Sequence, residues 1–231
     1  LLPTFYNQDD ISKKLKNDLY SKFSLDFTFN QKLNYNFFPR PHFISEEVFI
    51  IEDQNKISII DKMKIYVSLD NLFSIKNFTI NEVILDKANF ELNNKNSNFF
   101  LKILNNNFLD ANLKIKNSNF FFRNSEKEVL FINKIKNLKY YYDKSELKNI
   151  LYSENEIFNI PFSLEVINHE DEKRLYSKLN LDFAKLQIEN TSYYGDDMSS
   201  GLATLFFNKK KSLINYKTNK NFFVFDYYDE L

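Results

Sequence analysis

The sequence predicts a mainly β protein, in which a long antiparallel sheet is combined with an N-terminal amphipathic helix and one short additional helix. Two observations predict this class: apolar and polar residues alternate in many short segments, and 26 Phe and 14 Tyr occur among the 231 residues. Alternation is typical of strands that bury one face, and aromatic side chains supply a sizeable core. Because no Pro/Gly/Ser-rich linker divides the chain, we treat residues 1–231 as one domain.

The first predicted element is an amphipathic helix over residues 10–23. Leu15, Leu19 and Phe23 recur at helical spacing, and charged residues occupy the other side. The simplest interpretation is a surface helix that packs one stripe on a sheet, with binding to a membrane surface as the alternative. The short additional helix is predicted over residues 98–104, where apolar residues follow a serine and an asparagine that could cap it.

Strands are predicted wherever the alternation continues after this helix. Residues 25–29 and 33–37 are expected to form a hairpin, and prolines end its second strand. Residues 145–155 are polar and mixed, which indicates a loop or one helical turn. The further predicted strands are residues 43–51, 57–69, 78–85, 88–92, 109–115, 119–123, 129–133, 135–142, 160–166, 175–183, 202–207, 212–216 and 222–227.

Such strands favour an antiparallel sheet with one apolar face and one polar face. With so few helices, this sheet must curl over itself, meet a second sheet or hold something apolar in its concavity. Asparagine is expected to replace glycine in the tight turns, because it tolerates positive φ better than other side chains.

The leading candidate site is an apolar ladder on the hairpin that turns around residues 168–173. Its members are expected to face one way, whereas Leu181 and its neighbour Asp182 should face opposite sides of a strand. The ladder is either an ordinary closed core or the lining of a lipid-binding groove. Its members are Phe162, Leu164, Val166, Leu179, Leu181 and Phe183.

Composition argues against several other functions. The chain has 31 basic and 31 acidic residues, and this zero net charge argues against a nucleic-acid partner. Its 2 Gly are too few for a loop that cradles phosphate. With 0 Cys and 2 His, there is no thiol nucleophile, disulfide framework or Cys/His zinc cluster. We therefore expect no metal, no cofactor and no enzyme activity.

Isolated polar residues also favour structural roles. His42 lies beside aromatic residues, and His169 lies at an acidic hairpin tip. The paired carboxylates of residues 196–197 have no partner at glycosidase spacing. The basic run at residues 209–211 is most simply a turn, with contact to anionic head groups as the alternative.

The order of these features resembles the start of the AsmA family over roughly the first two thirds of the chain. Two departures are asparagine in place of the glycines that punctuate the family's turns, and a membrane helix that is missing before the first residue. The segments that carry the resemblance are Leu1-Leu2-Pro3, the helix from Asp10-Ile11 to Phe23, residues 33–37 leading into Phe38-Pro39-Arg40-Pro41-His42-Phe43, and residues 67–74, 80–92 and 115–123.

The resemblance implies a fragment of a longer protein, anchored in the bacterial inner membrane by the missing N-terminal helix and facing the periplasm. It also implies a long curved β-groove that carries phospholipid acyl chains and supports outer-membrane biogenesis. The alternative is a non-catalytic periplasmic structural or interaction module whose strand edges pair with other envelope proteins. An open edge at residues 222–227 would favour that alternative. A β-sandwich hydrolase would need converging acid, base or metal ligands, which the sequence does not display.

Overall fold

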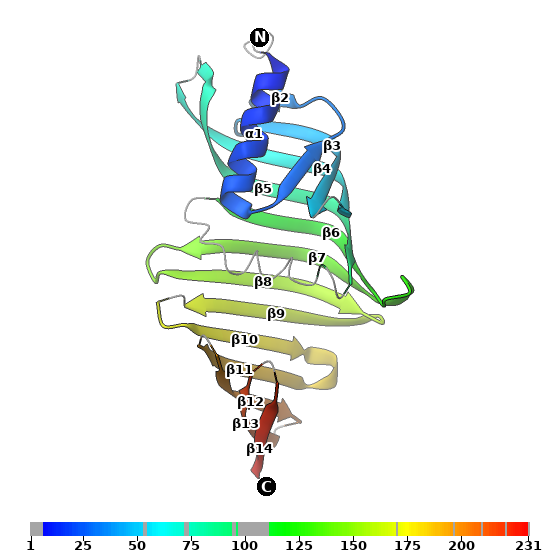
Figure 1. Cartoon of the computed structure of the whole chain (residues 1–231), viewed down its shortest axis with the longest axis vertical. Helices are drawn as coiled ribbons and strands as arrows, with labels where there is room; N and C mark the ends of the chain where they lie inside the picture. Colours follow the sequence, from blue (N-terminus) through cyan, green and yellow to red (C-terminus); the bar gives the residue numbers. More distant parts are fainter. Residues whose placement is uncertain are drawn as a thin grey trace.

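A computed structural model describes residues 7–52, 55–71, 74–93, 96, 111–169, 171–195, 197–208, 210–219 and 221–230. These residues form one long, curved sheet of 14 strands, with one α-helix and one 3-10 turn (Figure 1). The helix lies across one end of the stack of strands, and the last strand forms the other end. The predicted fold class is confirmed.

The strands follow one another through the sheet almost in chain order, as β1-β3-β4 and onward to β14, while β2 pairs with β3. The element bounds are α1 Gln8–Phe23, β1 Asp26–Phe29, β2 Asn34–Asn36, β3 His42–Glu52, β4 Asn55–Asn71, β5 Ser74–Leu92, β6 Asn112–Arg123, β7 Val129–Asp143, β8 Lys148–Ile157, β9 Ile160–His169, β10 Arg174–Leu181, η2 Asp182–Ala184, β11 Leu186–Tyr194, β12 Ser199–Phe207, β13 Lys210–Thr218 and β14 Phe223–Glu230.

Helix α1 has a defined cap at each end and one buried stripe. The Asn7 side chain accepts a hydrogen bond from the first turn, and Ser24 ends the helix in the left-handed conformation. Leu15, Leu19 and Phe23 are fully buried, and the helix packs against β1 and β5. The predicted helix and its simplest interpretation, a surface helix packed on the sheet, are therefore confirmed.

One face of the sheet carries the core, and we call it the apolar face. Residues directly opposite each other in a ladder lie on the same face, so the strand register defines this face from β1 to β14. The reverse side is called the polar face. Buried members of the apolar face include Phe27, Val48, Ile60, Leu85, Ile115, Leu138, Leu151 and Val166.

Several breaks in the alternation are irregularities inside long strands, not turns. Glu47, Lys87 and Asn117 have positive φ and lie in line across β3, β5 and β6. On β5 the buried residues are odd-numbered before Lys87, as in Val83 and Leu85, and even-numbered after it, beginning with Ala88. The predicted divisions of β5, β6 and β7 into two strands each are therefore wrong, because irregularities of this kind shift the alternation by one residue without ending the strand.

Two predicted pairings are also wrong. Strands β1 and β2 do not form a hairpin; each pairs with a different part of β3. Strands β5 and β6 pair in parallel, whereas all other described pairs are antiparallel. A parallel pair needs a long crossover connection, and residues 93–111 provide that length of chain.

Strands β8 and β11 were not predicted by the alternation. Both carry small polar residues on the apolar face: Ser153 and Asn155 on β8, and Asn190 and Ser192 on β11. Because these side chains interrupt the apolar alternation, residues 145–155 were wrongly predicted as a loop or helical turn. The predicted short helix at residues 98–104 lies outside the described residues, and the 3-10 turn η2 was not predicted.

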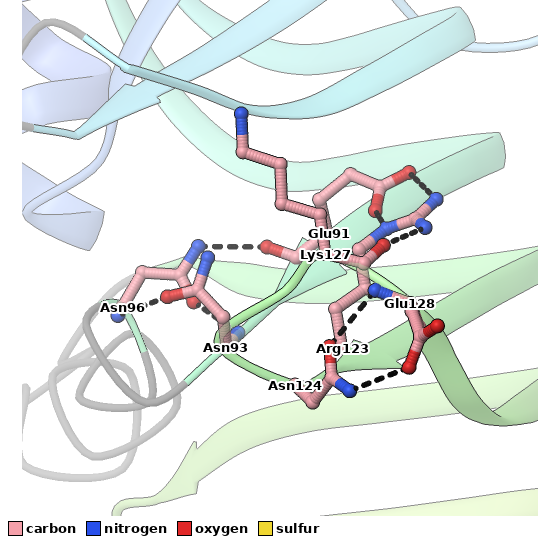
Figure 2. A network of polar contacts seen from close by, with 7 residues as sticks. All are labelled: Glu91, Asn93, Asn96, Arg123, Asn124, Lys127 and Glu128. Atoms are coloured by element: carbon pink, nitrogen blue, oxygen red, sulfur yellow. Dashed lines mark hydrogen bonds and ion pairs between the residues drawn. The ribbon is translucent and has the colours of Figure 1, made fainter.

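Asparagine shapes the turns more through its side chain than through positive φ. Figure 2 shows Asn124 in the β6–β7 turn, where its Oδ1 accepts a hydrogen bond from the Glu128 backbone N–H and its Nδ2 donates to the Glu128 carboxylate. The same Oδ1 also accepts from the Glu126 backbone N–H. Asn96 donates to the Glu91 carbonyl oxygen, and Arg123 forms an ion pair with the Glu91 carboxylate. Among the eleven described residues with positive φ, only Asn117, Asn159 and Asn208 are asparagine. The prediction that asparagine replaces glycine at positive φ in the tight turns therefore holds in part.

Candidate functional site

Toward the C-terminal end of the sheet the apolar face is less buried, and its charged residues beyond β12 are Lys210 on β13 and Asp229 on β14. On β10 to β12, described side chains of this face are mostly half-buried, and on β14 they are exposed. The register places no Asp, Glu, Lys or Arg on the described apolar face from β8 through β12. The polar face of the same strands carries Glu154, Glu165, Arg174, Lys178 and Glu189.

An aliphatic row crosses this face from strand to strand. We call it the aliphatic row, and its neighbouring members are register partners on adjacent strands. The members are Leu138, Ser153, Leu164, Leu179, Ile188 and Leu205. Because strands lie about 4.8 Å apart, the row is roughly 24 Å long. Leu138 and Ser153 are buried, so the half-buried part of the row runs from Leu164 to Leu205 and is roughly 14 Å long. This length is close to the roughly 15 Å that one acyl chain spans in half of a bilayer.

The structure brings five of the six predicted ladder residues together. Phe162, Leu164 and Val166 lie on the apolar face of β9, and Leu179 and Leu181 lie on the same face of β10. Leu164 and Leu179 are direct register partners.

The sixth predicted residue does not join them. Phe183 lies in the 3-10 turn after β10 and is 84% exposed. Asp182 begins the same turn, so it is not the opposite-facing strand neighbour of Leu181 that was predicted. Both errors have one cause, because the strand ends at Leu181 while the sequence alternation continues past it.

Sequence reasoning missed the contributions of β8 and β11 to this face. Leu151 and Ser153 extend the ladder on one side, and Leu186 and Ile188 extend it on the other. The alternate spacing of Leu186 and Ile188 was visible in the sequence. The Asn-Thr-Ser run at residues 190–192 interrupts this alternation, so β11, whose Ile188 pairs with Leu205 of β12, was not recognised as a strand.

The C-terminal end of the apolar face is aromatic. The ring of Tyr216 stacks on that of Phe223 at a centroid distance of 5.8 Å, and Phe223 lies 5.8 Å from Phe225. Tyr216 also covers Gly201, and its hydroxyl donates a hydrogen bond of 2.9 Å to Asn190 Oδ1. A Cβ on Gly201 would lie 2.8 Å from the Thr191 carbonyl oxygen, so glycine permits this close packing.

A separate charged cluster lies on the polar face near the N-terminal end. Glu82 is buried and forms ion pairs with Lys114 and with Arg40, whose Nη2 lies 2.8 Å from the carboxylate. The Arg40 guanidinium lies 4.3 Å from the Tyr66 ring, and Nδ1 of His42 lies 2.7 Å from the Arg40 carbonyl oxygen. The cluster fixes the proline-containing segment onto the sheet, and the expected structural role of His42 fits this position.

Burial raises the pKa of the Glu82 carboxyl, but hydrogen bonds and charge from Lys114 and Arg40 outweigh burial and hold the pKa below its ordinary value of 4.5. A pKa that is lower in the folded protein stabilises the fold at neutral pH, and this stabilisation is lost as the pH falls through the folded-state value.

We therefore expect Glu82→Gln to lower the free energy of unfolding by about 2 kcal/mol at pH 7, because it removes two charge-assisted hydrogen bonds. The difference from the wild type should narrow as the pH falls through the lowered folded-state pKa of Glu82, where the carboxyl itself becomes protonated. Urea unfolding of both proteins at pH 7 and at a series of lower pH values measures this difference. A difference that stays constant over the whole series would show that the ion pairs do not stabilise the fold.

The remaining polar candidates do not converge. His169 ends β9, Asp197 lies in the connection between β11 and β12, and Lys210 and Lys211 begin β13. Within the described ranges, no three His, Asp or Glu side chains are grouped as a metal site. The described part of the chain likewise contains no helix with the length and apolarity needed to cross a membrane.

No protein-family model and no curated protein matches this chain. Function is therefore inferred from the geometry and chemistry of the apolar face.

Proposed function

We propose that this chain is the membrane-proximal part of an AsmA-like lipid carrier, anchored in the bacterial inner membrane and facing the periplasm. In this proposal, phospholipid acyl chains lie against the apolar face and move along it in support of outer-membrane biogenesis. No residue acts as a catalyst, since moving a lipid along an apolar surface forms and breaks no covalent bond.

One observation carries the proposal: from β8 through β12, beyond the part of the sheet that α1 covers, the described apolar face carries no charged residue. A sheet that needed only a folded core would place its apolar residues where other elements bury them, and exposed apolar surface of this extent marks a binding surface. Here Leu179, Ile188 and Leu205 stay only half-buried, while Lys178 and Glu189 form an ion pair of 3.3 Å on the reverse side.

Photo-crosslinking in cells that express the full-length protein tests this proposal. A photoreactive residue at Leu179 should form lipid adducts, and the same residue at Lys178, the adjacent position on the polar face, should not. Adducts at Leu179 that contain only protein would indicate a closed surface and would contradict lipid binding.

A second function, strand pairing with another envelope protein, is favoured by strand β14. It is the last strand of the described sheet, and Phe223, Val224, Phe225, Tyr227 and Tyr228 are each more than half exposed. An exposed edge with large apolar side chains is a template for an added strand. Protein-only adducts at Leu179, together with crosslinks from Val224 to another protein, would favour this function over lipid carriage.

A further inference from the structure

Three hairpin turns on one rim of the sheet carry an exposed phenylalanine. Every second turn of an antiparallel meander lies on the same rim, so the turns that follow β8, β10 and β12 lie together (Figure 1). Phe158 is 75% exposed in the first turn, Phe183 is 84% exposed in the second, and Phe207 is 54% exposed where β12 ends. We call these three residues the aromatic rim.

The fold does not explain a phenylalanine in the first of these turns. Ile157 and Ile160 are register partners, so residues 158 and 159 form a two-residue hairpin loop, and their φ values are 52° and 63°. Such loops favour asparagine and glycine, because a bulky side chain is strained at positive φ. Since the Phe158 side chain is mostly exposed, it gains no core packing in return for this strain. A contact outside the described chain accounts for it.

The three rings are spaced for separate insertion. Turns two strands apart lie roughly 10 Å from each other, so the aromatic rim spans roughly 19 Å. Asn159 and Asn208 lie next to the first and third rings, so the rings do not form one continuous apolar patch. A protein interface has a continuous packed core, whereas a fluid bilayer interface accommodates each ring separately and favours aromatic side chains. The spacing therefore favours a membrane surface over a protein partner.

The turns of the aromatic rim are also rich in unpaired positive charge. Lys185 ends the second turn and Lys210 begins β13; both are exposed, and neither forms an ion pair with a described residue. Asp182 is the one acidic residue in the described parts of the three turns. Exposed lysines beside aromatic rings are attracted to anionic lipid head groups.

The opposite rim has the opposite charge. It also exposes Leu147 and Met198, but acidic residues outnumber basic ones in the described parts of its turns, residues 144–147, 171–173 and 197–198. An anionic membrane surface would attract the aromatic rim and repel this one.

We propose that the aromatic rim docks on the surface of a bilayer that contains anionic lipids. The three rings lie in the interfacial layer of that bilayer, and Lys185 and Lys210 lie beside the head groups. Phe207 is the register partner of Leu186, so docking brings one end of the apolar face to the membrane. This inference goes beyond lipid carriage and does not require it, because a docked rim binds the membrane whether or not acyl chains move along the face.

Single tryptophans report on this contact, because the chain contains no tryptophan. Phe158→Trp, Phe183→Trp and Phe207→Trp are made in the purified 231-residue chain and mixed with phosphatidylcholine vesicles that contain about one quarter phosphatidylglycerol. Brominated acyl chains in these vesicles should quench each rim tryptophan at least about twofold. Leu147→Trp is the matched control, since Leu147 lies in a turn of the opposite rim, is 56% exposed and has a φ of 50°. Its tryptophan should not be quenched.

Substitutions with asparagine separate docking from folding. Phe158→Asn should leave the melting temperature unchanged or raise it, because asparagine tolerates positive φ, and should weaken vesicle binding about fivefold to tenfold. Leu147→Asn makes the same change on the opposite rim and should alter binding by less than about twofold. Lys185→Gln combined with Lys210→Gln should weaken binding to the anionic vesicles about tenfold and leave binding to pure phosphatidylcholine unchanged.

The contrary outcomes are distinguishable from failure of the proposed function. Equal quenching at Leu147 and Phe183, or equal vesicle binding by Phe158→Asn and the wild type, would overturn docking by this rim. Absence of vesicle binding together with lipid adducts at Leu179 would overturn docking and leave lipid carriage intact. Crosslinks from Phe183 to another protein, with no vesicle binding, would assign the rim to a protein partner and overturn the inference.

Discussion

Leu179→Asp is expected to abolish lipid adducts on the apolar face while the protein stays folded. Leu179 lies in the middle of the aliphatic row, between Leu164 and Ile188, where its side chain is half-buried. A carboxylate there would have to lose its hydration beneath an acyl chain, which is strongly unfavourable without a partner. In the lipid-free protein the same carboxylate can reach water, so the loss of stability should stay near 1 kcal/mol.

The readout is a photoreactive residue at Leu205, two strands away on the same row. Asn180→Asp is the matched control, because it adds the same charge to the adjacent residue of the same strand but on the polar face. We expect at least a tenfold loss of lipid adducts for Leu179→Asp and little change for Asn180→Asp. Equal yields from both variants would show that the lipid does not cross this row.

Phe23→Ala should have the largest effect on stability, lowering the free energy of unfolding by about 4 kcal/mol. The Phe23 side chain is fully buried in the core that α1 shares with the sheet, so truncation removes apolar contacts and leaves a cavity. Urea unfolding followed by circular dichroism measures this loss.

Tyr20→Ala provides the control on the same helix. Tyr20 is also aromatic, but its side chain is 61% exposed, so its truncation should change stability by less than about 1 kcal/mol. Comparable losses for the two variants would contradict the burial pattern of α1 and its role as the cover of this end of the apolar face.

Local sequence patterns determined the elements whose neighbours lie close in the chain. Leu15, Leu19 and Phe23 define the buried stripe of α1 without reference to any other segment, because helical spacing alone places them on one face. The β9–β10 hairpin was likewise predictable, since the residues at both ends of a short turn pair almost automatically. Five candidate ladder residues were found for this reason.

The phase changes inside the strands could be interpreted only with the tertiary structure. At Lys87 and Asn117 a break in alternation looks the same in sequence whether the chain turns or continues through an irregularity. The choice depends on the neighbouring strands, because the irregularities lie in line across the sheet and each is accommodated by the next. The parallel pairing of β5 with β6 similarly depends on contacts between distant segments.

The candidate site divides in the same way. The sequence determined its chemistry: an apolar ladder in a chain of zero net charge with no cysteine. The tertiary structure decided its extent, since β8 and β11 carry Asn and Ser on the apolar face and are recognisable as strands only beside their partners. It also decided that Asn149 is buried and that its Oδ1 has no hydrogen-bond partner among the described residues. Hydrogen-bond satisfaction depends on atoms that the fold brings together from distant parts of the chain, and local sequence patterns do not specify them.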